Sequence, residues 1–134
     1  TNKKPKVFLK DTVLRTLIYT PDASKAMALI GNSQDTYGQS WHLPCDDNRL
    51  TYKEMIAEIS KQLGRTIKYD ILNRFILKMA SFFNQNIKET QELLPRYEMD
   101  NIFDSSKFKN RFPEFKVTSY QEGIKKIIDN YKIK

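Results

Sequence analysis

Residues 51–64 read Thr-Tyr-Lys-Glu-Met-Ile-Ala-Glu-Ile-Ser-Lys-Gln-Leu-Gly and carry the signals of a helix with both ends marked. Thr51 and Glu54 have the spacing of a capping box, in which the Thr hydroxyl accepts an amide proton of the first turn and the Glu side chain reaches back. Gly64 is the residue type that closes helices. Apolar residues fall on one face at helical spacing: Tyr52, Met55, Ile56, Ile59 and Leu63. We therefore predict an amphipathic helix here.

Helical signals recur on both sides of this segment. Thr20 is expected to cap a helix with Pro21 at its first position and Gly31 as its stop. Residues 75–83 are apolar nearly all round, which predicts a helix covered on several sides, either by this domain or by a missing one. Further helical stretches are expected over 87–97, over 104–112 with Asp104 or Ser105 at the start, and over 119–131.

Short runs rich in β-branched and aromatic residues predict strands between these helices. They cover residues 6–9, 14–19, 40–43 and 66–72, and the first two are expected to form a hairpin or to be neighbours. Strands and helices alternate without a βαβ rhythm or an internal repeat. We therefore expect a single α+β domain over residues 1–134, a small lobe of several helices around a few short strands.

Composition limits the classes of function. The chain has 134 residues, 40% of them hydrophobic, and a net charge of +7. This charge indicates either a polyanionic partner or the solvated surface of a lysine-rich protein. Cys45 is the single cysteine, so no internal disulfide forms, and Cys45 with His42 falls short of the four ligands of a structural zinc site. Without a signal peptide or an 18-residue apolar run, cytoplasmic localisation and no membrane partner are expected.

Catalytic and nucleotide-binding motifs are missing from the sequence. Four glycines cannot supply a Gly-x-Gly-x-x-Gly or Walker loop, and no tyrosine is followed by lysine four residues later. The one histidine has no nucleophile close to it in sequence. We therefore assign no catalytic, cofactor-binding or metal-binding residue to this chain.

Several segments nevertheless resemble a known family when they are taken in order. They are Arg15-Thr-Leu-Ile-Tyr-Thr-Pro-Asp22, Trp41-His-Leu-Pro44, Leu50-Thr-Tyr-Lys-Glu54, Phe103-Asp-Ser-Ser-Lys107, Phe112-Pro113 and Thr118-Ser-Tyr-Gln-Glu122-Gly123. Their order and spacing, from Arg15 to the C-terminus, resemble those of the extended short-chain dehydrogenases/reductases, the NAD-dependent epimerase/dehydratase family. In that family a Rossmann domain binds the nicotinamide cofactor, and a smaller C-terminal lobe closes over the substrate, often a nucleotide-sugar.

The resemblance implies that this chain is the C-terminal substrate-binding lobe, joined to the tail of the larger domain and lacking the N-terminal Rossmann domain. A first residue that is Thr1 instead of Met agrees with such a fragment. NAD or NADP would be bound by the full-length protein and not by this chain, which is expected to be inactive alone. The implied partners are the missing Rossmann domain and a small-molecule substrate, with a homo-oligomer as a further option and no nucleic acid.

Two arginines are implied to bind substrate. Arg15 occupies the position that many sugar-nucleotide epimerases use for substrate phosphate, and a planar, charged guanidinium suits that ligand. The alternative is a strand-end arginine in water. Arg96 stands in for a second phosphate-binding arginine, although the Gly-Asp that accompanies it in the family is absent. Asp22 is interpreted as a structural group at a helix start.

The substrate class and the function both have alternatives. The apolar stretch from residue 75 to 97 favours an isoprenoid, sterol-like or other small carbonyl compound over a nucleotide-sugar. Phe75, Met79, Phe82 and Phe83 would line that pocket or, as core residues, cover the seam to a neighbouring domain. The alternative function is a self-contained basic module that binds nucleic acid or a protein partner. A hydrolase is the third hypothesis, but the sequence offers no nucleophile for it.

Overall fold

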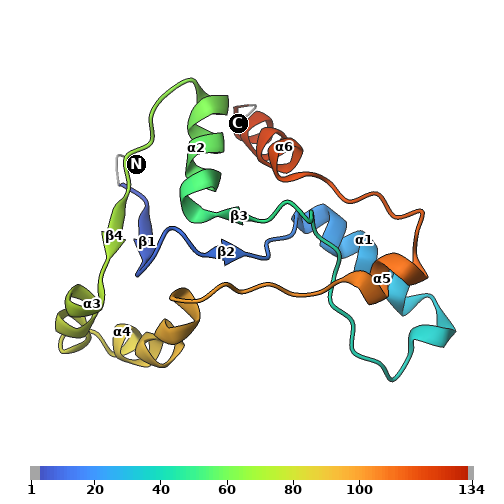
Figure 1. Ribbon diagram of the computed structural model, residues 1–134, viewed down its shortest axis with the longest axis horizontal. Helices are drawn as coiled ribbons and strands as arrows, with labels where there is room; N and C mark the ends of the chain where they lie inside the picture. The colour runs from blue at the N-terminus through green and yellow to red at the C-terminus, as the bar shows by residue number, and fades with distance from the viewer. Residues whose placement is uncertain (1–3, 133–134) are drawn as a thin grey trace. The chain divides into compact units, whose positions relative to one another are not determined.

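The computed structural model describes residues 4–132, apart from the side chains of residues 86, 90, 91 and 132. Helices and short strands are mixed along the chain, so the fold class is α+β as predicted (Figure 1). The chain forms two compact units, each made from two separate stretches of sequence. The first unit takes residues 1–15 and 50–101, and the second takes residues 16–49 and 102–134.

The first unit contains two pairs of strands and three helices, followed by a 3-10 segment. In chain order these are β1 (Lys6–Phe8), β2 (Leu14–Arg15), β3 (Leu50–Thr51), α2 (Tyr52–Leu63), β4 (Asp70–Leu72), α3 (Arg74–Ser81), α4 (Gln85–Thr90) and η2 (Gln91–Tyr97). Strand β1 pairs with β4 in parallel, and β2 pairs with β3 in antiparallel (Figure 1). Helix α2 therefore starts directly from a paired strand.

The capping box of α2 is confirmed. The Thr51 hydroxyl accepts the Glu54 amide proton at 3.2 Å, and the Glu54 carboxylate accepts the Thr51 amide proton at 2.8 Å. Gly64 ends the helix in the left-handed conformation, with φ of 64°. A side chain there would be strained, which explains the choice of glycine. The predicted apolar stripe is half-buried along its length.

The predicted pairing of the first two strands is wrong. Strand β1 uses its hydrogen bonds on β4, since the Asp70 amide donates to the Pro5 carbonyl and the Leu9 amide donates to the Leu72 carbonyl, both at 3.0 Å. The chain then turns sharply at Leu9, whose φ is 58°. Because the turn leads away from β1, no hairpin forms, and the strands predicted over 14–19 and 66–72 shorten to β2 and β4.

Helix α3 begins one residue earlier than predicted, and its surroundings differ from the prediction. Asn73 caps it by accepting the Ile76 amide proton at 2.9 Å. Within the described part of the helix only Leu77 is buried, so this chain does not cover α3 on several sides, and cover by a missing domain stays a prediction. The helix predicted over 87–97 divides into α4 and η2, and Pro95 lies inside η2, where it cannot donate a helical hydrogen bond.

The second unit is mainly helical. It contains α1 (Thr20–Gly31), η1 (Gln34–Thr36), α5 (Ser106–Arg111) and α6 (Tyr120–Lys132). Its core is centred on Phe108, whose side chain is 0% exposed. The Phe108 ring meets the rings of Phe112 at 4.9 Å and Phe115 at 5.2 Å between centroids. Ala26 of α1 and Ile124 of α6 are also buried, so both helices contribute to this core.

Three local predictions in the second unit need correction. The cap of α1 is Tyr19 and not Thr20, because the Tyr19 carbonyl accepts the amide protons of Asp22 and Ala23. Gly31 is the last helical residue, and Asn32 is the cap. Residues 40–43 pair with no strand in the described chain. Trp41 instead donates its indole proton to the Thr36 carbonyl at 3.1 Å, so a side chain secures this segment.

Candidate functional site

Arg15 is a buried cation in the first unit, and its side chain is enclosed by groups from three segments. Only 6% of the residue is exposed. Its Nη1 donates to the Arg96 carbonyl oxygen at 2.7 Å. Its Cζ lies 5.1 Å from the centre of the Tyr97 ring and 5.7 Å from the centre of the Tyr52 ring. Aromatic faces and a carbonyl oxygen both stabilise a positive charge that has left water.

Short backbone pairings hold these three segments together. Arg15 faces Leu50 across the β2–β3 pair, and Tyr52 follows at the start of α2. The segment after η2 is fixed to β2 by two hydrogen bonds. The Asn101 amide donates to the Leu14 carbonyl at 3.0 Å, and the Leu14 amide donates to the Asp100 carboxylate at 2.8 Å. The Arg15 environment is therefore part of the architecture of the first unit.

The structure brings the two predicted arginines together, but through different parts of each residue. Arg15 contributes its guanidinium, whereas Arg96 contributes its backbone carbonyl and keeps its own side chain exposed. A guanidinium at the surface can meet the phosphate of a ligand bidentately, while a buried one is held in a fixed orientation. The alternative of Arg15 as a strand-end arginine in water is therefore wrong, because the side chain is buried.

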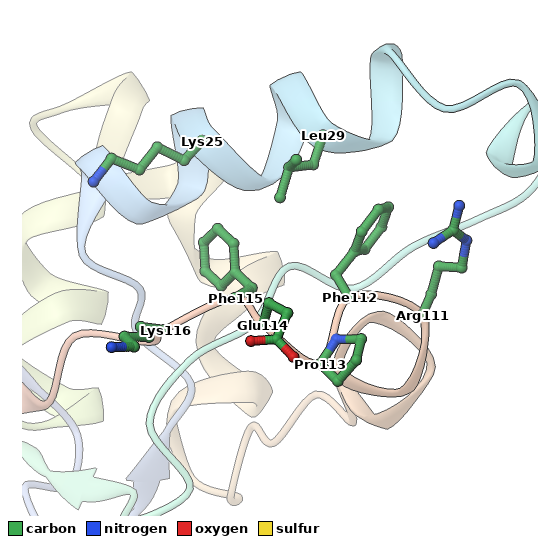
Figure 2. Close-up of a pocket in the computed structure, with 8 residues that line it drawn as sticks. All are labelled: Lys25, Leu29, Arg111, Phe112, Pro113, Glu114, Phe115 and Lys116. Atoms are coloured by element: carbon green, nitrogen blue, oxygen red, sulfur yellow. The ribbon is translucent and has the colours of Figure 1, made fainter.

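A separate groove lies in the second unit, between α1 and the loop that follows α5. Figure 2 shows the rings of Phe112 and Phe115 pointing from this loop toward α1, where Leu29 faces them. The groove has a volume of about 600 Å³, which is within the range of small-molecule sites. Its lining comprises Lys25, Leu29, Arg111, Phe112, Pro113, Glu114, Phe115 and Lys116. The lining contains no serine, cysteine or histidine that could act as a nucleophile.

Arg111, which lines the groove, is neutralised by an ion pair with Asp35. Arg111 donates to both carboxylate oxygens of Asp35, at 2.6 and 3.0 Å, and its Cζ lies 4.8 Å from the centre of the Phe112 ring. Hydrogen bonds from Arg111 hold the pKa of Asp35 below its ordinary value of 3.8. Lys25 and Lys116 are exposed at the rim and form no ion pair with any described residue. Sequence analysis did not find this groove, although the spacing of Phe108, Phe112 and Phe115 offered a signal.

Other polar residues named from the sequence have structural contacts. Asp22 is buried and accepts the Thr118 amide proton at 2.7 Å, which links the start of α1 to the segment before α6. His42 is exposed, and its Nδ1 lies 2.9 Å from the Asp104 carbonyl oxygen. Burial raises the pKa of the Cys45 thiol, which opposes the thiolate form that a nucleophile needs.

Comparison with known proteins finds no match. No protein-family model fits the chain, and no curated protein or solved structure is significantly similar to it. Among the described residues, no cluster of His, Cys, Asp and Glu could hold a metal ion. None of the helices in the described part is both long enough and apolar enough to cross a membrane. The function therefore has to be argued from the geometry of the two units.

The Asp35–Arg111 pair predicts a pH effect on stability. Because the pKa of Asp35 is lowered in the folded chain, the pair stabilises the fold above pH 3.8, and this contribution is lost as the pH falls below that value. We expect Asp35→Asn to lower the melting temperature slightly at pH 7 and to have less effect at pH 3. Thermal unfolding at both pH values measures this difference.

Asp129→Asn is the matched control, because Asp129 is exposed and has no ion-pair partner among the described residues. Equal effects of Asp35→Asn at pH 7 and pH 3 would show that the pair contributes nothing to folding. The effect is expected to be small, since exposed ion pairs contribute little.

Proposed function

We propose that the chain is the substrate-binding part of an NAD(P)-dependent epimerase, dehydratase or reductase of the extended short-chain family, and that it is inactive alone. The substrate in this proposal is a nucleotide-sugar or another small carbonyl or hydroxyl compound. The main support is the contact between Arg15 and the carbonyl of Arg96, which lies 81 residues later in the chain. The family resemblance assigns substrate contacts to these two residues.

The helix starts give independent support. The motif segments that resemble the family contain a helix start at Thr20, a capped start at Tyr52, a short helix from Ser106 and a last helix from Tyr120. The starts at Tyr52 and Ser106 fall where the family pattern has a helix start. The last helix differs, because the Ser119 hydroxyl, and not that of Thr118, accepts the Glu122 amide proton at 3.2 Å. A chance resemblance of short motifs would not require agreement between motif positions and helix boundaries.

The cofactor belongs to the full-length protein in this proposal. A dinucleotide cradle needs glycines at which a Cβ would clash with the ligand or the turn. A Cβ built at Gly31, Gly38 or Gly64 meets no atom within 4 Å. At Gly123 the nearest atoms belong to the Tyr19 side chain, the first of them at 3.5 Å. These residues do not fit an NAD or NADP site, so we assign no step of hydride transfer to this chain.

The charge distribution gives less support to the alternative of a nucleic-acid-binding module. Several basic side chains of the second unit are already bound to acids or carbonyls. Lys109 contacts Asp47 at 2.6 Å, Lys126 contacts Glu122 at 2.7 Å, and Lys107 donates to the Ser40 carbonyl at 3.1 Å. Groups engaged in this way release fewer counterions from a phosphate backbone.

Ligand binding by the full-length protein tests the proposal. We expect that protein to bind NAD or NADP, measured by quenching of its tryptophan fluorescence, and the 134-residue chain to bind neither. Arg96→Ala in the full-length protein should weaken the binding of UDP, used as a nucleoside diphosphate probe, about 10-fold. That factor corresponds to the loss of one charge-assisted contact of about 1.4 kcal/mol.

Arg65→Ala is the control for charge, because Arg65 is an exposed arginine of the same unit. A full-length protein that binds neither NAD nor NADP would contradict the proposal. If it binds the cofactor but not UDP, the substrate is the small carbonyl or hydroxyl compound and not a nucleotide-sugar. Salt-sensitive binding of the 134-residue chain to duplex DNA would support the alternative module.

A further inference from the structure

The groove of the second unit has an apolar middle and a cationic end. Leu29 of α1 is 39% exposed, and the rings of Phe112 and Phe115 are half-buried, so all three side chains present apolar surface in the groove. Figure 2 shows Lys25 and Lys116 together at one end, beyond the Phe115 ring. A ligand that fits this order of groups has an apolar body with a charged group at one end.

The charges around the groove favour an anion at that end. Four charged side chains line the groove, and one of them, Arg111, is neutralised by Asp35 at 2.6 Å. Lys25 and Lys116 then remain against Glu114 alone, and none of these three forms an ion pair within the described part of the chain. The lining therefore keeps a net positive charge, which complements a ligand with a single negative group.

Helix α1 sets the distance between the charged end and the apolar middle. Lys25 and Leu29 are four residues apart in this helix, so they lie on the same face and about 6 Å apart along its axis. Figure 2 shows the Leu29 side chain pointing from α1 toward the rings of the loop. A carboxylate joined directly to a two-ring aromatic body spans this distance.

The phenylalanine rings of the groove favour an aromatic body. Aromatic pairs are attracted in offset and edge-to-face arrangements beyond the effect of the area that they bury. Phe112 and Phe115 each make such a contact with Phe108, at 4.9 and 5.2 Å between centroids, and neither ring is fully covered by it. The volume of about 600 Å³ is sufficient for a small aromatic molecule between these rings and α1.

The groove keeps its shape without a ligand. The Phe112 amide donates to the Phe108 carbonyl at 2.9 Å, and the Phe115 amide donates to the Phe112 carbonyl at 3.0 Å. The Asp22 carboxylate accepts the Thr118 amide proton at 2.7 Å, which fixes the end of the same loop to the start of α1. A site that is shaped in advance loses little conformational entropy when a ligand binds.

We propose that this groove binds a small carboxylic acid with an aromatic body. The carboxylate lies beside Lys25 and Lys116. The aromatic body packs against Leu29, Phe112 and Phe115. This site goes beyond the proposed function, because the two arginines of that proposal belong to the first unit.

Titration of the 134-residue chain with naphthoate, followed by heteronuclear NMR, tests the proposal. We expect the amide signals of residues 25–29 and 111–116 to shift. Naphthamide has the same body without the charge, and we expect it to bind about 5-fold more weakly, since exposed ion pairs make modest contributions. The titration contains neither NAD nor UDP, so its failure would not count against the proposed enzyme function.

The lysines are tested by a pair of double variants with equal net charge. Lys25→Met with Lys116→Met keeps side chains of similar length and should remove the preference for naphthoate over naphthamide. Lys61→Met with Lys125→Met removes two exposed lysines that do not line the groove, and it should keep the preference. If both double variants lose the preference equally, the net charge of the chain attracts the acid and the proposal is overturned.

The apolar middle is tested at α1. Leu29→Glu should weaken naphthoate binding about 10-fold or more, because it places a negative charge where the aromatic body packs. Met27→Glu makes the same change at a residue of α1 that is 55% exposed and does not line the groove, so it should have little effect. Circular dichroism would verify that both variants are folded. Absence of naphthoate binding, equal affinity for naphthamide, or signal shifts outside the groove would each overturn the proposal.

Discussion

Replacing Phe108 by alanine is expected to lower the free energy of unfolding by about 3–5 kcal/mol. The ring is completely buried and packs against the rings of Phe112 and Phe115. Its removal costs the transfer free energy of the ring and leaves a cavity that neighbouring rings fill only in part. A loss of this size is a large fraction of the stability of a single domain. Urea unfolding followed by circular dichroism measures it.

Two further variants define what the Phe108 measurement means. Phe108→Leu keeps most of the apolar volume and should cost much less. Phe103→Ala removes the same group from a residue that is 44% exposed, and it should cost less than about 1 kcal/mol. If Phe108→Ala also costs less than 1 kcal/mol, the ring cluster is not the core of the second unit.

The groove of the second unit depends on the same cluster. Phe112 and Phe115 line the groove, and both rings pack against the Phe108 ring. Phe112 is the C-cap residue of α5, and Pro113 and Glu114 separate it from Phe115, which lies outside any helix. Packing on Phe108 therefore sets the shape of the groove, and Phe108→Ala should alter it even if the chain stays folded.

Features marked by nearby residues could be predicted from the sequence. The capping box of Thr51 and Glu54, the left-handed Gly64 and the start of α5 after Ser105 all depend on contacts within a few residues. Local hydrogen-bond chemistry decides such positions, so a short window of sequence contains the necessary information. The α+β class followed from the same helix and strand signals.

Features that depend on distant residues could not be predicted in this way. Strand β1 pairs with β4, which is more than sixty residues away in sequence, and a local pattern does not specify its partner. Arg15 was identified as a residue of interest, but its burial depends on Tyr52 and Tyr97 from two other segments. For residues 75–83 the sequence left open whether this chain or a missing domain covers the helix, because an apolar helix alone does not indicate what packs against it.

The second large effect on the free energy of unfolding is expected at Arg15. Substitutions there separate a structural role from a ligand-binding role. We expect Arg15→Ala to lower the free energy of unfolding by about 2–4 kcal/mol. It removes a hydrogen bond from a charged donor, worth roughly 1.5–3 kcal/mol, and the contacts with two aromatic rings. The Arg96 carbonyl would also lose its partner. Urea unfolding of the 134-residue chain measures the change without any ligand.

Arg15→Lys makes this measurement specific to the guanidinium. Lysine keeps the charge but lacks the planar group that lies over the Tyr52 and Tyr97 rings, so we expect about half of the alanine effect. Arg96→Ala is the matched control, since Arg96 contributes its carbonyl and an exposed side chain, and it should change stability by less than about 0.5 kcal/mol. If Arg15→Lys leaves stability unchanged but abolishes UDP binding by the longer protein that we propose, Arg15 is primarily a ligand-binding residue. If Arg15→Lys instead lowers stability and leaves UDP binding unchanged, Arg96 keeps the ligand-binding role, and Arg15 is the group that fixes the Arg96 segment.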